Sequence, residues 1–342
     1  MDDGEVLVVK RRWLSAPAAV LFLLSPVVGE LLSGSAPPAE FFNPLGFVML
    51  AVLYGGGAIL IREMTFWREK GWPTVLVFGA AYGIAEEGLM CKSFFDPAWM
   101  DLGPLGHYGR WLGVNWVWAA ELTIYHAVFS IAIPIVLVSI IFPKRRSEAW
   151  ISRPTFVGLS GLWGVNAALI FFFISKYRPP VAHYVLTLVI TAGLCVLALR
   201  LPDTMFANKW KREKAARLLW FFLTGFVGTL CLFFLAWVLP QAGVYPIVTI
   251  LMLMGLVVVV GWLVLRMAGG GMVLSDRHKL ALISGALGFF ILLAPLQELD
   301  KKRADNTAGM TIVGLLMAVF LTWVVLRLRL ARRTSEQPEN VE

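Results

Sequence analysis

Charged residues are scarce in this chain of 342 residues, in which Asp, Glu, Lys and Arg together account for 15% and hydrophobic residues for 58%. Soluble globular domains carry about 25% charged residues, so this composition excludes that class. Apolar runs of about 20 residues, each long enough to cross ~30 Å of hydrocarbon, recur along the whole chain. The sequence therefore predicts an all-α, polytopic integral membrane protein with about ten transmembrane helices. The predicted spans are 14–33, 44–62, 73–92, 112–142, 155–175, 181–200, 216–239, 243–266, 279–298 and 307–328.

Cysteine is rare as well. The three cysteines, Cys91, Cys195 and Cys231, all fall in or at the edge of predicted spans, and their spacing matches no metal-binding motif. The sequence also lacks a convincing internal repeat, which disfavours a transporter built from inverted halves. The loops between the spans are short, so no soluble domain is predicted.

The basic residues are distributed unevenly between the two sides of the membrane. If ten spans are threaded in turn, 23 of the 30 Lys and Arg residues fall on the side that holds both chain termini. Cytoplasmic loops carry an excess of Lys and Arg, so we predict a cell-membrane protein with both termini in the cytoplasm. This topology accounts for the net charge of +8 without a nucleic-acid partner, and the expected partners are membrane lipids.

Acidic residues inside the spans are rarer still. Of the 22 Asp and Glu residues, only Glu30, Glu86, Glu87 and Glu121 lie well inside a span, and all four belong to the first four spans. His126, in the fourth span, is the only histidine deep in the membrane. Ionisable groups are costly to bury in hydrocarbon and usually mark function. We therefore divide the chain into a site-bearing part (1–142), six further apolar helices (143–330) and a disordered cytoplasmic tail (331–342).

Helical geometry predicts where these groups lie. A rise of ~1.5 Å per residue puts the four acids in one slab of the outer half of the bilayer, with His126 nearer the midplane. A rotation of ~100° per residue predicts that Glu86 and Glu87 point in different directions. The small residues Gly79 and Gly83 continue to Glu87 as a stripe that permits close helix packing.

The fourth predicted span has its own stripe. Asn115, His126 and Ser130 share one face of that helix, and Glu121 flanks it. A carboxylate shielded from water can take a proton from water, and a neutral imidazole can donate to an oxyanion or coordinate a divalent metal. The same groups also suit proton relay or cation coordination, so the residue types leave hydrolysis and transport both open.

The arrangement of motifs resembles the CPBP intramembrane proteases, the family of the CAAX-processing endopeptidase and the abortive-infection proteins. Glu86 and Glu87 match that family's glutamate pair, and the Leu122 to His126 segment resembles its second motif. His183, followed by Thr187, is a candidate for its third. Cys91 stands where the family has arginine. The resemblance covers roughly residues 80–190.

This resemblance implies a helical bundle in which Glu86 or Glu87 activates a water and His126 positions it or stabilises the oxyanion. The implied substrate is a membrane-embedded peptide or a lipidated protein, and the need for a metal is left open. Glu30, Glu121, Asn115 and His183 are candidates for lining the site.

Structural roles are the alternatives. The glutamate pair can bind Lys92 or Arg110, and His126 can be a hydrogen-bonded core residue. Glu121 can pair with His126 or Asn115 to hold the packing. Two other functions therefore remain open beside the hydrolase: a proton- or cation-coupled transporter, and a membrane scaffold whose buried acids are structural.

Overall fold

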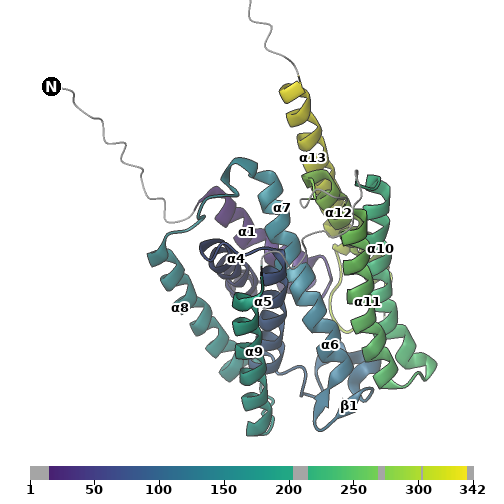
Figure 1. Ribbon diagram of the computed structural model, residues 1–342. Coiled ribbons are helices and arrows are strands. Elements are labelled where there is room, and N and C mark those ends of the chain that lie inside the picture. Colours follow the sequence, from purple (N-terminus) through teal and green to yellow (C-terminus); the bar gives the residue numbers. More distant parts are fainter. Residues whose placement is uncertain (1–14, 203–214, 269–273, 302, 337–342) are drawn as a thin grey trace, which may run out of the picture.

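The computed structural model describes residues 15–202, 215–268, 274–301 and 303–336 (Figure 1). Within these residues the chain is almost entirely helical, and the only sheet is a two-residue hairpin of β1 (Arg110–Trp111) with β2 (Val114–Asn115). Eight helices in this described part of the chain are long and apolar enough to cross a membrane. The predicted polytopic all-α fold is therefore confirmed.

The helical rods of the described residues, of which eight are the candidate membrane spans, are built from the following elements. They are α1 with η1 (Ala16–Pro26, Val27–Leu31), α3 with η2 and α4 (Pro44–Leu50, Ala51–Gly56, Gly57–Trp67), α5 with η3 (Trp72–Ala85, Glu86–Met90), α6 with η5 and α7 (Trp116–Tyr125, His126–Ala132, Ile133–Ile141), α8 with η7 (Arg153–Leu169, Ile170–Ile174), α9 (Val181–Arg200), α10 with η8 and η9 (Leu218–Phe233, Phe234–Val238, Leu239–Ala242), α11 (Pro246–Met267), α12 (Asp276–Leu299) and α13 (Met310–Glu336). Short helices α2 (Pro38–Phe41), η4 (Met100–Gly106) and η6 (Pro143–Arg145) lie in the connections.

These ten rods coincide with the ten predicted spans. The rod α1–η1 is shorter than the eight long apolar helices, and α5–η3 carries the two adjacent glutamates. Several rods begin at a polar cap followed by proline: Ser15, Asn43 and Ser152 each accept a hydrogen bond from a backbone N–H in the first turn. A capping oxygen satisfies an N–H that has no partner within the helix, and the proline at the first or second position of each helix has no N–H to satisfy.

The connecting loops gather at two opposite ends of the bundle. At one end Lys70 Nζ donates to the carbonyl of Leu201, and Arg146 pairs with Asp276. At the other end His183 Nε2 lies 2.8 Å from the carbonyl oxygen of Leu112. This grouping requires consecutive rods to run in opposite directions, as the threading of ten spans predicts. The assignment of the Lys- and Arg-rich end to the cytoplasm stays a prediction.

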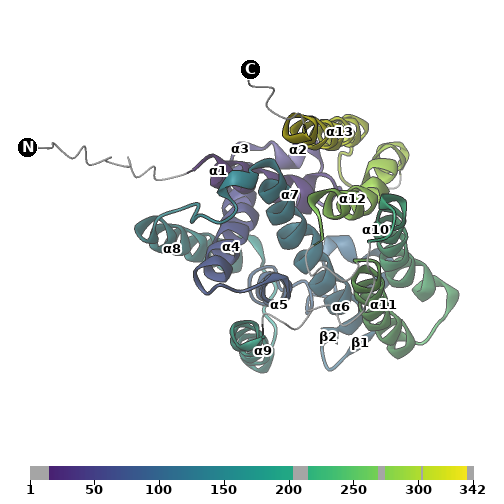
Figure 2. The same ribbon diagram turned by 45° about the horizontal axis from the view of Figure 1, so that its top comes forward.

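The centre of the bundle is the α6–η5–α7 rod. Its apolar window is 78% buried inside the protein, compared with 11% for α8, α9 and α11 at the periphery. Figure 2 shows α5, α6 and α7 in the middle, with α8 and α9 on one side and α10–α13 on the other. A functional site on the central rod is therefore enclosed by protein, whereas the outer helices present apolar side chains to lipid.

The predicted disordered tail is wrong in its first part. Helix α13 continues to Glu336, six residues into the segment 331–342. Arg and Ala favour helix, and no glycine or proline occurs between Gly314 and Pro338. Residues 337–342 lie outside the described residues.

Several rods contain a wider, π-helical turn. In the described residues these turns are η1, η2, η3, η5, η7 and η8. A π-helical turn inserts a residue into the α-helical pattern and shifts the side chains that follow it, and these turns are frequent at functional sites. Four of the six converge on one group of buried polar side chains.

Candidate functional site

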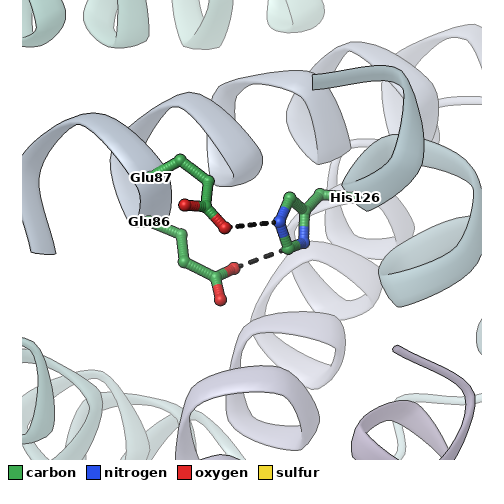
Figure 3. Close-up of side chains that lie close together, drawn as sticks. All are labelled: Glu86, Glu87 and His126. Carbon is green, nitrogen blue, oxygen red and sulfur yellow. Dashed lines mark hydrogen bonds and ion pairs between the residues drawn. The ribbon is translucent and has the colours of Figure 1, made fainter. Parts of the chain in front are cut away.

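Glu86, Glu87 and His126 form a compact buried cluster between two rods (Figure 3). Glu87 Oε1 lies 3.0 Å from His126 Nε2, and Glu86 Oε2 lies 3.4 Å from His126 Nδ1. The two carboxylates therefore approach the imidazole at its two different nitrogens. The predicted meeting of the glutamate pair with His126 is present in the structure.

Small residues bring the two rods this close together. A Cβ atom at Gly83 would lie 2.8 Å from His126 Cβ, and one at Gly79 would lie 2.8 Å from the Cα of Ala127. Both distances are shorter than side chains tolerate, so glycine is required for this approach. The predicted small-residue stripe of helix α5 is the contact surface with η5.

The rotation of ~100° per residue predicts that Glu86 and Glu87 point in different directions. This prediction is wrong for their carboxylate groups. Their Cα positions are adjacent on the helix, but both carboxylates reach the same imidazole (Figure 3). Both residues lie in the π-helical turn η3 (Glu86–Met90), where the ~100° rotation of an α-helix does not hold. The flexible glutamate side chains can therefore converge on His126 from two sides.

Tyr54 extends the cluster to a third acid. Its hydroxyl lies 2.5 Å from Glu30 Oε1 and is also hydrogen-bonded to Glu86 Oε1. A phenol has one proton and can donate to only one of these carboxylates. Tyr54 therefore lies between the two carboxyl groups and can donate to either of them. Glu30 is therefore joined to the cluster through Tyr54.

Serine side chains hold the other two members. Ser93 Oγ donates to Glu87 Oε2, and Trp118 Nε1 donates to Ser93 Oγ at 3.0 Å. On the far side of the ring, Ser130 Oγ lies 3.0 Å from His126 Nδ1. Each of these contacts is intramolecular and buried, so the orientations of Glu87 and of the imidazole are fixed by the fold.

The four π-helical turns supply the cluster. Glu30 comes from η1, Tyr54 from η2, the glutamate pair from η3, and His126 with Ser130 from η5. The wider turns thus occur at the same depth in four different rods. We take this coincidence as the strongest local sign that the cluster is functional.

The cluster is shielded from solvent but not uniformly. The side chains of Glu86 and His126 are each 2% exposed, whereas that of Glu87 is 10% exposed. Thr187 on helix α9 packs over the backbone at Gly88, where an added Cβ would lie 2.6 Å from its Cγ2. Helix α9 therefore packs against the π-helical turn η3 that carries the glutamate pair.

Three other predicted site residues lie elsewhere. Glu121 accepts a hydrogen bond from Trp237 Nε1 at 2.8 Å. Asn115 caps helix α6 and donates to the carbonyl of Leu105. His183 contacts the carbonyl of Leu112 and stacks edge-on against Phe95. All three make structural contacts, and none is a member of the glutamate–histidine cluster.

The structural alternative was that Glu86 and Glu87 pair with Lys92 or Arg110, and the contacts of these two cations do not support it. Lys92 Nζ donates to the carbonyls of Phe171 and Ser175, both at 2.7 Å, and lies over the Phe171 ring. Arg110 donates to backbone carbonyls, the nearest being that of Phe95 at 2.8 Å. These cations therefore brace the loops, and the glutamates pair with His126.

Sequence reasoning missed Tyr54, Ser93 and Trp118. A signal was available for Tyr54, because it is the only tyrosine in its span and stands directly before three glycines. Glycines allow two helices to approach closely, so a polar side chain next to them comes near the neighbouring rod. Ser93 and Trp118 give no sequence signal of this kind, since serine and tryptophan are ordinary at membrane interfaces.

The same three side chains are the candidate metal ligands. Glu86, Glu87 and His126 each offer one ligand atom, and these atoms lie within 4.8 Å of one another. Two carboxylates and one imidazole form a donor set suited to a divalent ion such as Zn²⁺. In the described conformations, however, the carboxylates approach different ring nitrogens, so a bound ion would require one of them to rotate.

Comparisons with known proteins describe a membrane protein and assign no activity. A family model described as an uncharacterized membrane protein family matches residues 19–340. The chain is also similar to an uncharacterized protein of Archaeoglobus fulgidus, with 28% identity over 125 residues. That match covers 36% of this chain and 38% of the relative, so the chain matches well under half of the relative's length. No solved structure matches the chain.

Proposed function

The chain belongs to this uncharacterized membrane protein family, and we propose that it is an intramembrane hydrolase of the CPBP type. Its substrate would be a peptide bond in a membrane-embedded or lipidated polypeptide. The observation that carries the proposal is the pair of carboxylates on the two nitrogens of a single buried imidazole. This arrangement supplies a proton acceptor and a proton donor side by side.

Glu86 is assigned the role of general base. Its Oε2 is buried, and apart from the 3.4 Å ion-pair contact with His126 Nδ1 it accepts no hydrogen bond within the described part of the chain, so we assign this oxygen to accept a proton from water. The hydroxide attacks the carbonyl carbon of the scissile bond and forms a C–O bond. Because a positioned carboxylate lies in a site shielded from solvent, proton transfer needs no rearrangement of surrounding water.

His126 is assigned the role of acid, with Glu87 as its partner. The imidazolium donates a proton to the leaving nitrogen as the C–N bond breaks, and the Glu87 carboxylate stabilises the positive charge at 3.0 Å. Ser130 on Nδ1 keeps the ring in one orientation. The proton that Glu86 took from water replaces the one that the imidazole gave away, so the enzyme returns to its starting state.

Helix α9 is the proposed route of access. It is largely lipid-facing, and its Thr187 packs on Gly88, the residue that follows the glutamate pair. Movement of α9 away from α5 would open the cluster to the bilayer, where a membrane-embedded substrate lies. A substrate that enters from lipid needs no large aqueous cleft, and this fits the low exposure of the cluster.

The test is cleavage by the purified protein in lipid vesicles with a panel of fluorogenic transmembrane peptides. Wild type is compared with Glu86→Gln, Glu87→Gln and His126→Ala. Loss of a general acid or base costs about 10²–10⁴-fold in rate, and we expect Glu86→Gln and His126→Ala to fall in that range. Glu121→Gln is the matched control, because Glu121 is an acid as buried as Glu86, lies on the rod that carries His126, and contacts Trp237 instead of the cluster. Equal cleavage by all variants would contradict the assignment.

A second function, proton-coupled transport, is favoured by one specific observation. Glu30, Tyr54, Glu86, His126 and Glu87 form an unbroken series of contacts that could relay a proton between rods. The transport function predicts a proton flux into vesicles that carry a pH-sensitive dye. It also predicts that this flux is lost in Tyr54→Phe, because that substitution interrupts the series of contacts. The hydrolase account predicts no flux and cleavage that requires Glu86.

A further inference from the structure

One charge that develops in the proposed reaction has no assigned partner. When hydroxide attacks the scissile carbonyl, the carbonyl oxygen becomes an oxyanion, and hydrolases stabilise this charge with a positioned O–H or N–H donor. The carboxylates of Glu86 and Glu87 only accept hydrogen bonds, and His126 is assigned to the leaving nitrogen. A separate donor is therefore needed beside the cluster.

Four side-chain donors around the cluster are already engaged in it. Each makes a hydrogen bond that orients a carboxylate or the imidazole, or that braces a side chain doing so: Tyr54, Ser93, Trp118 and Ser130. Turning one of them toward a substrate would release the group that it holds. The donor for the oxyanion is therefore to be sought among the other side chains that contact the cluster.

Tyr82 is such a side chain. It lies on helix α5, four residues before Glu86, so the two residues are neighbours on the surface of that rod. Only 6% of Tyr82 is exposed. The centre of its ring lies 6.0 Å from that of His126 and 6.1 Å from that of Tyr54. The phenol therefore stands beside both the imidazole and the proposed base.

The hydroxyl of Tyr82 is buried and makes no hydrogen bond within the described part of the chain. It lies near enough to the Glu86 carboxylate to interact with it, but the separation and orientation of the two groups do not complete a hydrogen bond. A buried donor without an acceptor costs stability, so such donors are rare in folded proteins and call for an explanation. An acceptor that arrives with the substrate provides one.

Close packing holds the Tyr82 ring in one place. On one side lies Gly57 of α4, where an added Cβ would be only 2.5 Å from Cε2 of the ring. Trp163 of α8 packs against the ring as well, with 6.3 Å between the ring centres. A donor that is fixed before the reaction needs no reorganisation when the charge develops, and this is the property that makes such donors effective.

We propose that Tyr82 is a catalytic residue whose hydroxyl donates a hydrogen bond to the oxyanion of the scissile carbonyl. As the C–O bond to the attacking hydroxide forms, the electron pair of the C=O double bond moves onto the carbonyl oxygen, and the phenol holds that charge while keeping its own proton. When the double bond re-forms, the C–N bond breaks and the leaving nitrogen takes its proton from His126. This role rests on the proposed hydrolase function.

The experiment measures kcat and KM of the purified full chain in lipid vesicles, with a transmembrane peptide that the wild type cleaves. Tyr82→Phe keeps the ring and removes only the hydroxyl. Loss of one oxyanion donor lowers kcat about 10²–10³-fold, and we expect that fall with KM changed by less than about twofold. Tyr125→Phe is the matched control, because its ring lies 5.5 Å from the same imidazole but its hydroxyl donates to the Gly29 carbonyl.

A second measurement separates catalysis from packing. In a phosphinate analogue of the same peptide, a tetrahedral P–O⁻ group replaces the oxyanion, and transition-state analogues report contacts made only in the transition state. We expect Tyr82→Phe to weaken binding of the phosphinate by about the factor by which kcat falls, with binding of the cleaved product peptide unchanged. Equal weakening of phosphinate and product would show a structural role for Tyr82 and overturn the proposal.

The outcomes distinguish this role from the hydrolase function itself. If Glu86→Gln abolishes cleavage while Tyr82→Phe retains the wild-type kcat, the role of Tyr82 is wrong and the hydrolase assignment stands. If the wild type cleaves no peptide of the panel and binds no phosphinate, the hydrolase assignment is wrong and the role of Tyr82 is overturned with it.

Discussion

His126 Nε2 lies 3.0 Å from Glu87 Oε1, although the two residues are 39 positions apart and belong to different rods. This contact fixes the relative height of α5–η3 and α6–η5–α7 in the bundle. It also places an imidazole against a carboxylate where solvent is excluded, so the strength of the contact is not reduced by water.

Replacing Tyr54 with phenylalanine tests the bridge between Glu30 and Glu86. The variant loses a buried hydroxyl that contacts two carboxyl groups, and hydrogen bonds to charged groups contribute about 1.5–3 kcal/mol. We expect the free energy of unfolding in mixed micelles to fall by about that amount, together with hydrolytic activity. Tyr125→Phe is the control, because Tyr125 donates only to the Gly29 carbonyl and its loss should leave the cluster intact. Wild-type activity in Tyr54→Phe would exclude a role for the bridge.

Adding one methyl group at Gly83 tests the close approach of the two rods. In Gly83→Ala the new Cβ would lie 2.8 Å from His126 Cβ and push the imidazole away from the glutamates. Overpacking of this kind costs about 1–3 kcal/mol, and we expect activity to fall more than stability. The comparison is Gly161→Ala on α8, where the added atom meets nothing within 4 Å. If both variants keep full activity, the distance between the rods does not matter for the chemistry.

The sequence was sufficient to predict the positions of the rods and a similar depth for the buried acids and His126, but not which of these groups meet. Apolar run length set the spans, and the depth estimate placed Glu86, Glu87 and His126 near one another. That estimate works because helical rise is nearly constant along a membrane rod. It could not reveal Tyr54, which becomes significant only through its contacts with carboxylates on two other rods.

Rotation around the helix explains why Glu121 was misassigned. Glu121 and His126 are five residues apart, which corresponds to about 140° around an α-helix, so their side chains leave on different faces. Glu121 accordingly meets Trp237 on η8. Asn115 does share a face with His126, but it lies eleven residues away, or ~16 Å along the axis. Depth alone was therefore too coarse, and the π-helical turns cannot be recognised from residue types.

The pH dependence of stability is expected to involve Asp101, in the loop between α5 and α6. Burial, reinforced by the charge of Glu87, raises the pKa of the Asp101 carboxyl from 3.8 to about 6. A raised pKa means that the folded state binds the proton more tightly than the unfolded state. The ionised carboxyl therefore costs stability above pH 6, and this cost disappears as the pH falls below about 4.

Asp101→Asn should remove that cost. At pH 8 we expect the variant to be more stable than wild type by about 1–2 kcal/mol, a value reduced to allow for partial exposure of the side chain. The two proteins should converge as the pH is lowered through 6 towards 4. Unfolding curves in mixed micelles at pH 4, 6 and 8 provide the measurement. A constant difference at all three values would show that Asp101 does not titrate in this range.

Removal of divalent metal tests which form of the cluster is active. Glu86 and Glu87 contact different nitrogens of His126, so the described conformation fits proton transfer by the side chains themselves. We therefore expect activity to stay within about twofold after dialysis against EDTA, a change much smaller than the ~10²-fold loss of a catalytic group. Loss of activity that Zn²⁺ restores would instead identify Glu86, Glu87 and His126 as a metal centre.

The central claim, that the buried glutamate–histidine cluster hydrolyses peptide bonds, is tested most directly in ¹⁸O-labelled water. Wild type, Glu86→Gln and Glu121→Gln are reconstituted in vesicles with the same transmembrane peptide panel, and the products are analysed by mass spectrometry. The account predicts ¹⁸O in the new C-terminal carboxyl group for wild type and Glu121→Gln, with at least about 100-fold less product for Glu86→Gln. Absence of labelled product from wild type, or equal labelling by Glu86→Gln, would contradict it.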